Sequence, residues 1–217
     1  MKTTLLVLLS AAALATVRAD LTVTQEFQQE SPAQKMTVTM KIKGDKVRMD
    51  GNPEVTTLID VKSGDTKNLM HSQKKVMAIP GALIKQIQAA QSAGKSADKI
   101  AEPKATGRTE TISGYACEEY EIDAEGTKIQ VWLTKDLPAA QRVMSDLAKL
   151  SADADPLKGM LDGEKLEGFP MKTVIQPASG GKATVTVVAL NEDPLPEADF
   201  EVPKGYEAMQ MPGMPGR

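Results

Sequence analysis

The stretch MTVTMKIK at residues 36–43 decides the fold class. Apolar side chains occupy every second position, and threonine or lysine occupies the positions between them. Successive side chains of a strand point to opposite sides, so this period of two produces one apolar face and one polar face. Such a strand is typical of an antiparallel sheet that buries one face and leaves the other in water. The stretch therefore predicts a half-buried strand.

Alternating segments of the same kind continue on both sides of this strand. They follow each other up to residue 79, with turns indicated by Gly44-Asp45 and by Ser-Gly-Asp at residues 63–65. A second series runs over residues 108–190, and within it Trp132 lies on the opposite face from its apolar neighbours at positions 129, 131 and 133. The two series predict a meander of short antiparallel strands joined by hairpins.

Two segments change to the period of a helix. Leu83 and Ile87 are four residues apart and follow a Pro-Gly pair, and Val143 and Leu147 repeat the spacing after Asp-Leu-Pro at residues 136–138. The predicted fold class is therefore mainly β (α+β). We expect a curved antiparallel sheet whose apolar face is covered by two helices as a lid.

The N-terminus has the order of a secretory signal peptide at residues 1–19. Lys2 precedes a short apolar run, and Val17 and Ala19 are the small residues before a cleavage point. We therefore expect export to the periplasm or the extracellular space. Loss of this segment leaves 24 basic and 29 acidic residues, hence a net charge of −5. An acidic surface argues against nucleic acid as a partner, because nucleic acid selects clustered lysine and arginine.

The rest of the chain has the size of one domain, which we place at residues 20–206. The polar stretch Lys95–Gly107 predicts a loop within it. A tail rich in methionine, proline and glycine follows at residues 207–217, and its lack of periodicity predicts disorder. No later segment is apolar over the roughly 20 residues that a membrane-spanning helix needs.

The residues that usually carry chemistry have simpler interpretations here. Cys117 is the only cysteine, and its alternating strand predicts burial rather than reactivity. His71 is the only histidine and is expected to be solvated at a hairpin end, without the spacing of a zinc site. Glu118, Glu119 and Glu121 predict a charged strand edge or outer face. With no recognisable catalytic motif, we expect no enzyme activity, metal or cofactor.

Several segments resemble known families. The sequence TISGYACEEY at residues 111–120 and VWLTKDL at residues 131–137 resemble the centre of domain-of-unknown-function family 4412. KGDKVRMD at residues 43–50, followed by LID at residues 58–60, resembles the early meander of LolA-like lipoprotein carriers. The closing Phe-x-x-Pro-x-Gly-Tyr at residues 200–206 is common to both groups.

The resemblance covers roughly residues 21–206 and implies a half-open β-barrel or curved sheet with a helical lid. In carriers of this fold the apolar interior holds the acyl chains of lipids or lipoproteins. This chain departs from them in its first meander, where the tryptophan and phenylalanine clusters of the carriers are missing. Met36, Met40 and Met49 stand there instead.

The residues and the resemblance together predict a non-enzymatic exported binding protein with an apolar cavity for lipid or another hydrophobic ligand. The candidate cavity or core residues are Met36, Val38, Met40, Ile42, Leu83, Ile87, Val143 and Leu147. Two alternatives stay open. One is an interaction module that binds a protein partner on an edge strand or outer face, and the other is Cu(I) binding by the methionines of the tail.

Overall fold

The computed structural model describes four segments of the chain, residues 20–92, 102–124, 126–148 and 166–209. The predicted signal peptide and the part of the predicted tail beyond Met209 lie outside the described residues. Within the four segments, none of the helices has the length and apolar character that crossing a bilayer requires.

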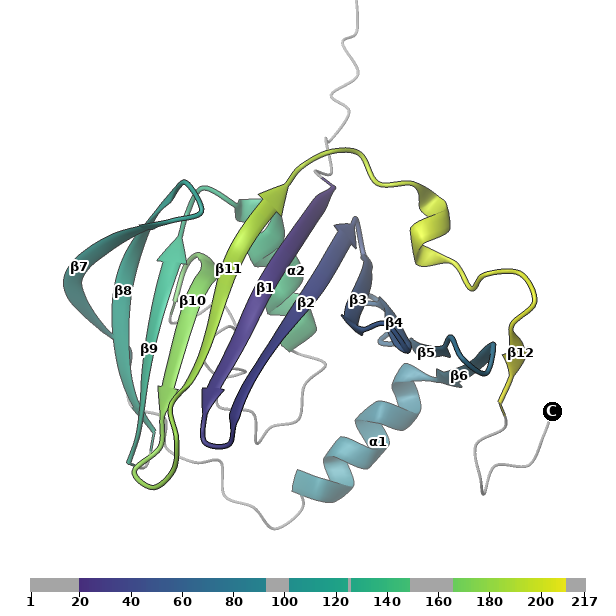
Figure 1. Cartoon of the computed structure of the whole chain (residues 1–217), viewed down its shortest axis with the longest axis horizontal. Coiled ribbons are helices and arrows are strands. Elements are labelled where there is room, and N and C mark those ends of the chain that lie inside the picture. The colour runs from purple at the N-terminus through teal and green to yellow at the C-terminus, as the bar shows by residue number, and fades with distance from the viewer. Residues whose placement is uncertain (1–19, 93–101, 125, 149–165, 210–217) are drawn as a thin grey trace, which may run out of the picture.

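Twelve strands form one sheet, which is antiparallel except at its β12–β6 edge (Figure 1). The strands are β1 (Leu21–Glu30), β2 (Ala33–Lys43), β3 (Lys46–Asn52), β4 (Val55–Asp60), β5 (Thr66–Met70), β6 (Lys75–Ile79), β7 (Lys104–Ile112), β8 (Tyr115–Ala124), β9 (Thr127–Thr134), β10 (Phe169–Gln176), β11 (Ala183–Asn191) and β12 (Glu207–Ala208). Their order is β12-β6-β5-β4-β3-β2-β1-β11-β10-β9-β8-β7, so the sheet is open, with β12 and β7 at its two edges.

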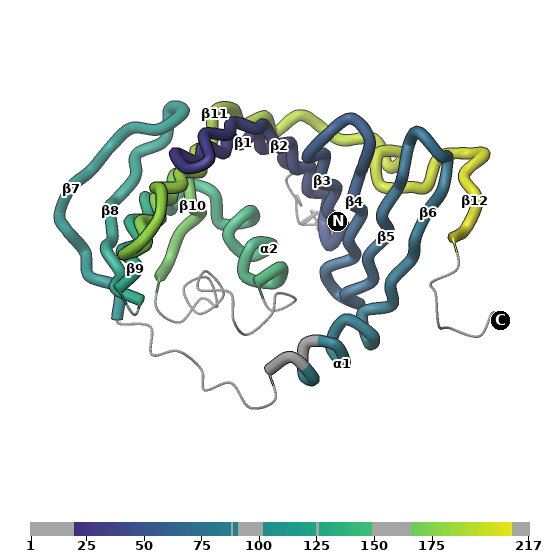
Figure 2. The backbone as a smooth tube through the Cα atoms, turned by 60° about the horizontal axis from the view of Figure 1, so that its bottom comes forward, coloured from purple at the N-terminus to yellow at the C-terminus, as the bar shows by residue number. Residues whose placement is uncertain are grey.

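Two helices accompany the sheet, α1 (Gly81–Ser92) and α2 (Pro138–Ala148). The sheet arches over α2, as Figure 2 shows, and we call the side on which α2 lies the inner face. On α2 the buried residues Ala140 and Val143 join a cluster with Leu21 and Ile42 of the sheet. The predicted fold class, a curved antiparallel sheet with two helices, is thereby confirmed.

Strand register shows which residues of the meander share the inner face. Ile42 pairs with Leu21 on one side and with Val47 on the other, and Met40 pairs with Val23 and Met49 in the same way. These pairs carry the apolar side chains of the predicted alternation. The polar residues between them, among them the lysines of β2, therefore point to the opposite, outer face.

The segment at residues 192–206, which we call the strap, runs from β11 past β3 to the β6 edge (Figure 1). It contains a short 3-10 helix, η1 (Glu197–Phe200). Lys41 lies 2.7 Å from Asp199, and Lys46 lies 2.7 Å from Glu197. These pairs hold the strap to the outer face of β2 and β3.

Two boundaries differ from the sequence-based expectation. Strand β7 begins at Lys104, inside the predicted loop, and is exposed at most of its positions. The predicted disordered tail begins at residue 207, but Glu207 and Ala208 form β12 and pair with Lys75 and Val76. Both segments are held by backbone hydrogen bonds rather than by buried apolar side chains, so neither carries an apolar period.

Candidate functional site

An apolar pocket of about 160 Å³ lies between α2 and the sheet. Leu21 and Ile42 line it from β1 and β2, and Leu137, Ala140 and Val143 line it from α2 and the residue before it. Exposed charged residues, among them an arginine and two carboxylates, complete the lining. Empty apolar cavities of roughly 150 Å³ in other proteins take up benzene, so this pocket has room for a short stretch of alkyl chain.

A stripe of apolar side chains continues from this pocket along the inner face of β2. Ile42, Met40, Val38 and Met36 follow each other at alternate positions over about 20 Å. Burial falls along the stripe, because Ile42 is 2% exposed, Met40 is 3% exposed and Met36 is 45% exposed. The end of the stripe that lies away from the pocket is therefore open to solvent.

Further methionines lie on the same face of the sheet as this stripe. Register through β3, β4, β5 and β6 places further methionines on the same face, half-buried, and α2 contributes one that packs against the core. The inner-face set consists of Met36, Met40, Met49, Met70, Met77 and Met144, half of the 12 methionines of the chain. Unbranched thioether side chains adapt to ligands of different shape, which suits an apolar binding surface.

Helix α1 is fixed at its first residue and is exposed further along. The backbone N–H of Gly81 donates to Oδ1 of Asp65 at 2.8 Å. Beyond this point Leu83 is half-buried and Ile87 is 47% exposed. The apolar side of α1 is thus less covered than that of α2.

Alanine at position 81 is expected to disturb the start of α1. Its Cβ would lie 2.2 Å from the carbonyl oxygen of Ser63 and 2.8 Å from the carbonyl carbon of Gly64. Both are backbone atoms, which cannot move away as the end of a flexible side chain can. We expect the free energy of unfolding in urea to fall by about 1–3 kcal/mol, as for other overpacked sites. Gly51→Ala is the matched control, since its nearest atom would be 4.0 Å away. Equal stability of the two variants would contradict this packing.

The structure places the eight predicted cavity or core residues in different surroundings. Ile42 and Val143 line the pocket, and Met40 and Leu147 pack in or against the core. Val38 and Leu83 are half-buried, whereas Met36 and Ile87 are exposed. Sequence reasoning missed Leu21, Leu137 and Ala140, although Leu21 begins an alternating segment and Ala140 lies three residues before Val143.

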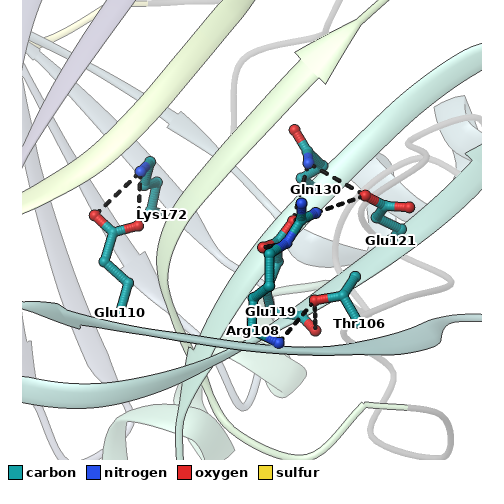
Figure 3. Close-up of polar contacts among 7 residues, drawn as sticks. All are labelled: Thr106, Arg108, Glu110, Glu119, Glu121, Gln130 and Lys172. Carbon is teal, nitrogen blue, oxygen red and sulfur yellow. Dashed lines mark hydrogen bonds and ion pairs between the residues drawn. The ribbon is translucent and has the colours of Figure 1, made fainter.

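A polar network lies on the other half of the sheet (Figure 3). The carboxylate of Glu119 is 3% exposed and accepts two hydrogen bonds of 2.6 Å from Arg108 and one of 2.9 Å from Gln130. Arg108 also reaches Glu121 at 2.8 Å. The expectation of a charged strand edge or outer face is wrong at Glu119, because β8 lies between β9 and β7 and Arg108 covers and neutralises the buried carboxylate. Glu118 and Glu121 are exposed.

Two neighbours of this network also have structural roles. Lys172 forms an ion pair of 2.9 Å with Glu110 (Figure 3) and lies 4.3 Å from the centre of the Trp132 ring. Cys117 is 1% exposed, as predicted, and burial raises the pKa of its thiol. A buried cysteine with a raised pKa holds little thiolate, so Cys117 is not arranged for nucleophilic chemistry.

His71 is half-buried rather than solvated, which corrects the sequence-based expectation. Its Nε2 lies 2.9 Å from the hydroxyl of Thr56, which donates to Asp50, and its Nδ1 lies 2.5 Å from the hydroxyl of Tyr206. Partial burial raises the pKa of Asp50, but hydrogen bonds from Arg48 and Thr56 outweigh it and hold that pKa below its usual value. The network ties the end of the strap to the outer face. Among the described residues, no group of three His, Cys, Asp or Glu side chains could hold a metal ion.

Comparison with known proteins identifies the family. The sequence profile described as "Domain of unknown function (DUF4412)" matches residues 14–206. The chain belongs to the DUF4412 family. The predicted family is thereby confirmed, and a comparison with curated protein sequences finds no match.

Comparison with solved structures finds matches to this DUF4412 protein at low sequence identity. PNGF-II has a TM-score of 0.46 and 14% identity, over 90% of this chain and 31% of its own. MucB, a LolA-like protein solved in complex with MucA(peri), has a TM-score of 0.41 and 11% identity, over 89% of this chain and 58% of its own. A DUF1329 family protein from Desulfovibrio piger has a TM-score of 0.35 and 13% identity, over 84% of this chain and 90% of its own. The chain thus spans about a third of PNGF-II and just over half of MucB.

Proposed function

We propose that this DUF4412 protein is an exported, non-enzymatic binding protein that holds the alkyl chain of a lipid-like amphiphile on its inner face. The observation that carries the proposal is the continuity between the pocket and the stripe. Ile42 lines the pocket and Met36, at the other end of the same stripe, is 45% exposed. A chain inserted at the pocket would reach the exposed end of the stripe only by displacing the side chains that cover Met40, which is 3% exposed.

The energetics of burial support an alkyl chain as the occupant. Each methylene removed from water contributes about 0.8 kcal/mol, so six to eight carbons would supply roughly 5–6 kcal/mol before the entropic cost of binding. The half-buried Met49, which pairs with Met40, can move aside or close over such a chain, because its side chain has several low-energy conformations.

The polar networks elsewhere favour a binding role over chemistry. Glu119 is neutralised by Arg108, Glu110 is paired with Lys172, and His71 is bonded on both nitrogens. A general acid or base needs a proton donor or acceptor aimed at a substrate position. These groups are instead aimed at one another and hold strands or the strap in place.

Native mass spectrometry tests the proposal directly. The mature protein would be purified without detergent, measured intact, and then extracted with organic solvent. We expect a reproducible adduct with the mass of an amphiphile, or uptake of a long-chain fatty acid added to the apo protein. A clean apo mass with no uptake of added fatty acid would contradict the proposal and favour a protein partner.

A further inference from the structure

We propose that Met36 is an oxidation site, and that its conversion to the sulfoxide by hypochlorous acid weakens apolar binding on the inner face. The second part of this inference rests on the proposed function, whereas the position of oxidation does not. Met36 and Met40 make the comparison possible, because they lie on one face of one strand and differ in exposure, at 45% and 3%.

Exposure decides which of the two sulfurs meets an oxidant. Met40 is packed in the core cluster with Val23 and Ile42, so an attacking molecule reaches it only if the strand opens. Met36 pairs with Phe27 near the far end of β2, and nearly half of it is in contact with solvent. Methionine oxidation follows access to the sulfur, so Met36 should react first.

The chemical step is an oxygen-atom transfer. An electron pair of the Met36 thioether forms a bond to the oxygen of hypochlorous acid while the oxygen–chlorine bond breaks. Chloride leaves, and the hydroxyl proton passes to water. The sulfur is oxidised by two electrons, and the chlorine is reduced by two.

The product changes the binding surface more than it changes the fold. A sulfoxide is polar and chiral, and it strongly accepts hydrogen bonds. At an exposed position it remains solvated, so the free protein tolerates it. A bound alkyl chain would strip that solvation without supplying a donor, and burying an unpaired polar group is unfavourable.

The site of oxidation is tested on the intact mature protein with less than one equivalent of hypochlorous acid. Trypsin cleaves after Lys35 and Lys41, so residues 36–41 form one peptide that contains both methionines. Fragment-ion spectra of this peptide then assign the added oxygen. We expect it on Met36, and equal labelling of Met40 at early times would overturn the inference.

The effect on binding is tested with cis-parinaric acid as a fluorescent probe. Oxidation should weaken its binding by roughly tenfold, which corresponds to about 1.4 kcal/mol. Met36→Leu keeps the apolar surface without a sulfur, so its affinity should survive the same treatment, whereas Met36→Gln should bind weakly from the start.

The two proposals fail in different ways. Unchanged affinity after Met36 is oxidised would overturn the switch and leave the binding function standing. Absence of probe binding to the reduced protein would overturn the binding function and the switch with it.

Discussion

Replacing Ala140 by leucine is expected to weaken the binding of an alkyl-chain ligand strongly while the protein stays folded. Ala140 is 4% exposed and lines the pocket from α2. Three added carbon atoms would occupy much of a space of about 160 Å³ and contact the Leu21 and Ile42 side of the pocket. Leucine is nearly as good a helix former as alanine, and filling a void adds apolar contacts. We therefore expect unchanged or slightly higher stability in urea.

Titration with cis-parinaric acid measures the effect. The affinity of Ala140→Leu should be at least about tenfold lower than that of the parent, the equivalent of roughly 1.4 kcal/mol. Ala198→Leu is the matched control, because Ala198 is exposed on η1, across the sheet from the pocket. A folded Ala140→Leu variant that binds the probe like the control would show that the ligand does not enter this pocket.

The part of the fold that follows from side-chain periodicity could be predicted. The alternation at residues 36–43 predicted β2, and the opposite placement of Trp132 and its neighbours is matched by two clusters, one with Trp132 and the other with Ile129 and Val131. Helical spacing likewise located α2 and its buried Val143. Each of these elements buries one face. Its apolar residues therefore recur about every 2 residues in a strand or every 3.6 residues in a helix, and this spacing is visible in the sequence.

The part of the fold that depends on backbone pairing, or on contacts between residues far apart in the sequence, could not be predicted. The first part of strand β7, residues 104–107, was expected to be a loop, because it lies at an exposed edge of the sheet and buries no apolar side chain. Arg108 covers Glu119 only because the register sets Thr109 opposite Glu118, and Tyr206 meets His71 across 135 residues of chain. Such contacts are properties of the assembled sheet.

The candidate site shows the same division. Ile42 and Val143 were found because both belong to apolar stripes. Leu137 and Ala140 line the same pocket, but a pocket is a space where two elements fail to fill each other. Its position depends on how α2 is set against β1 and β2, which no local spacing encodes. The sequence therefore predicted one lining residue on the sheet, Ile42, and one on α2, Val143, but not the other residues that line the pocket.

Replacing Phe169 by alanine is expected to cause a large loss of stability. Phe169 is 0% exposed and belongs to the same core cluster as Val143 of α2. It follows Gly168, whose φ is +138° and where an added Cβ would lie 2.9 Å from both Leu133 and Thr134, so the chain is closely confined at the start of β10. Truncation leaves a cavity in a place where the backbone cannot collapse, and we expect a loss of about 3–5 kcal/mol.

Urea unfolding of Phe169→Ala, compared with Phe27→Ala, tests where the stability of the fold resides. Phe27 lies on β1 opposite Met36 and is half-buried, so its removal should cost clearly less. The free energy of unfolding of a natural protein is about 5–15 kcal/mol, so the Phe169→Ala variant should keep only a small part of its stability. Equal losses would mean that the surface around Met36 is part of the core. The predicted difference instead separates the closely packed region where α2 meets β10 from the more exposed surface around Met36.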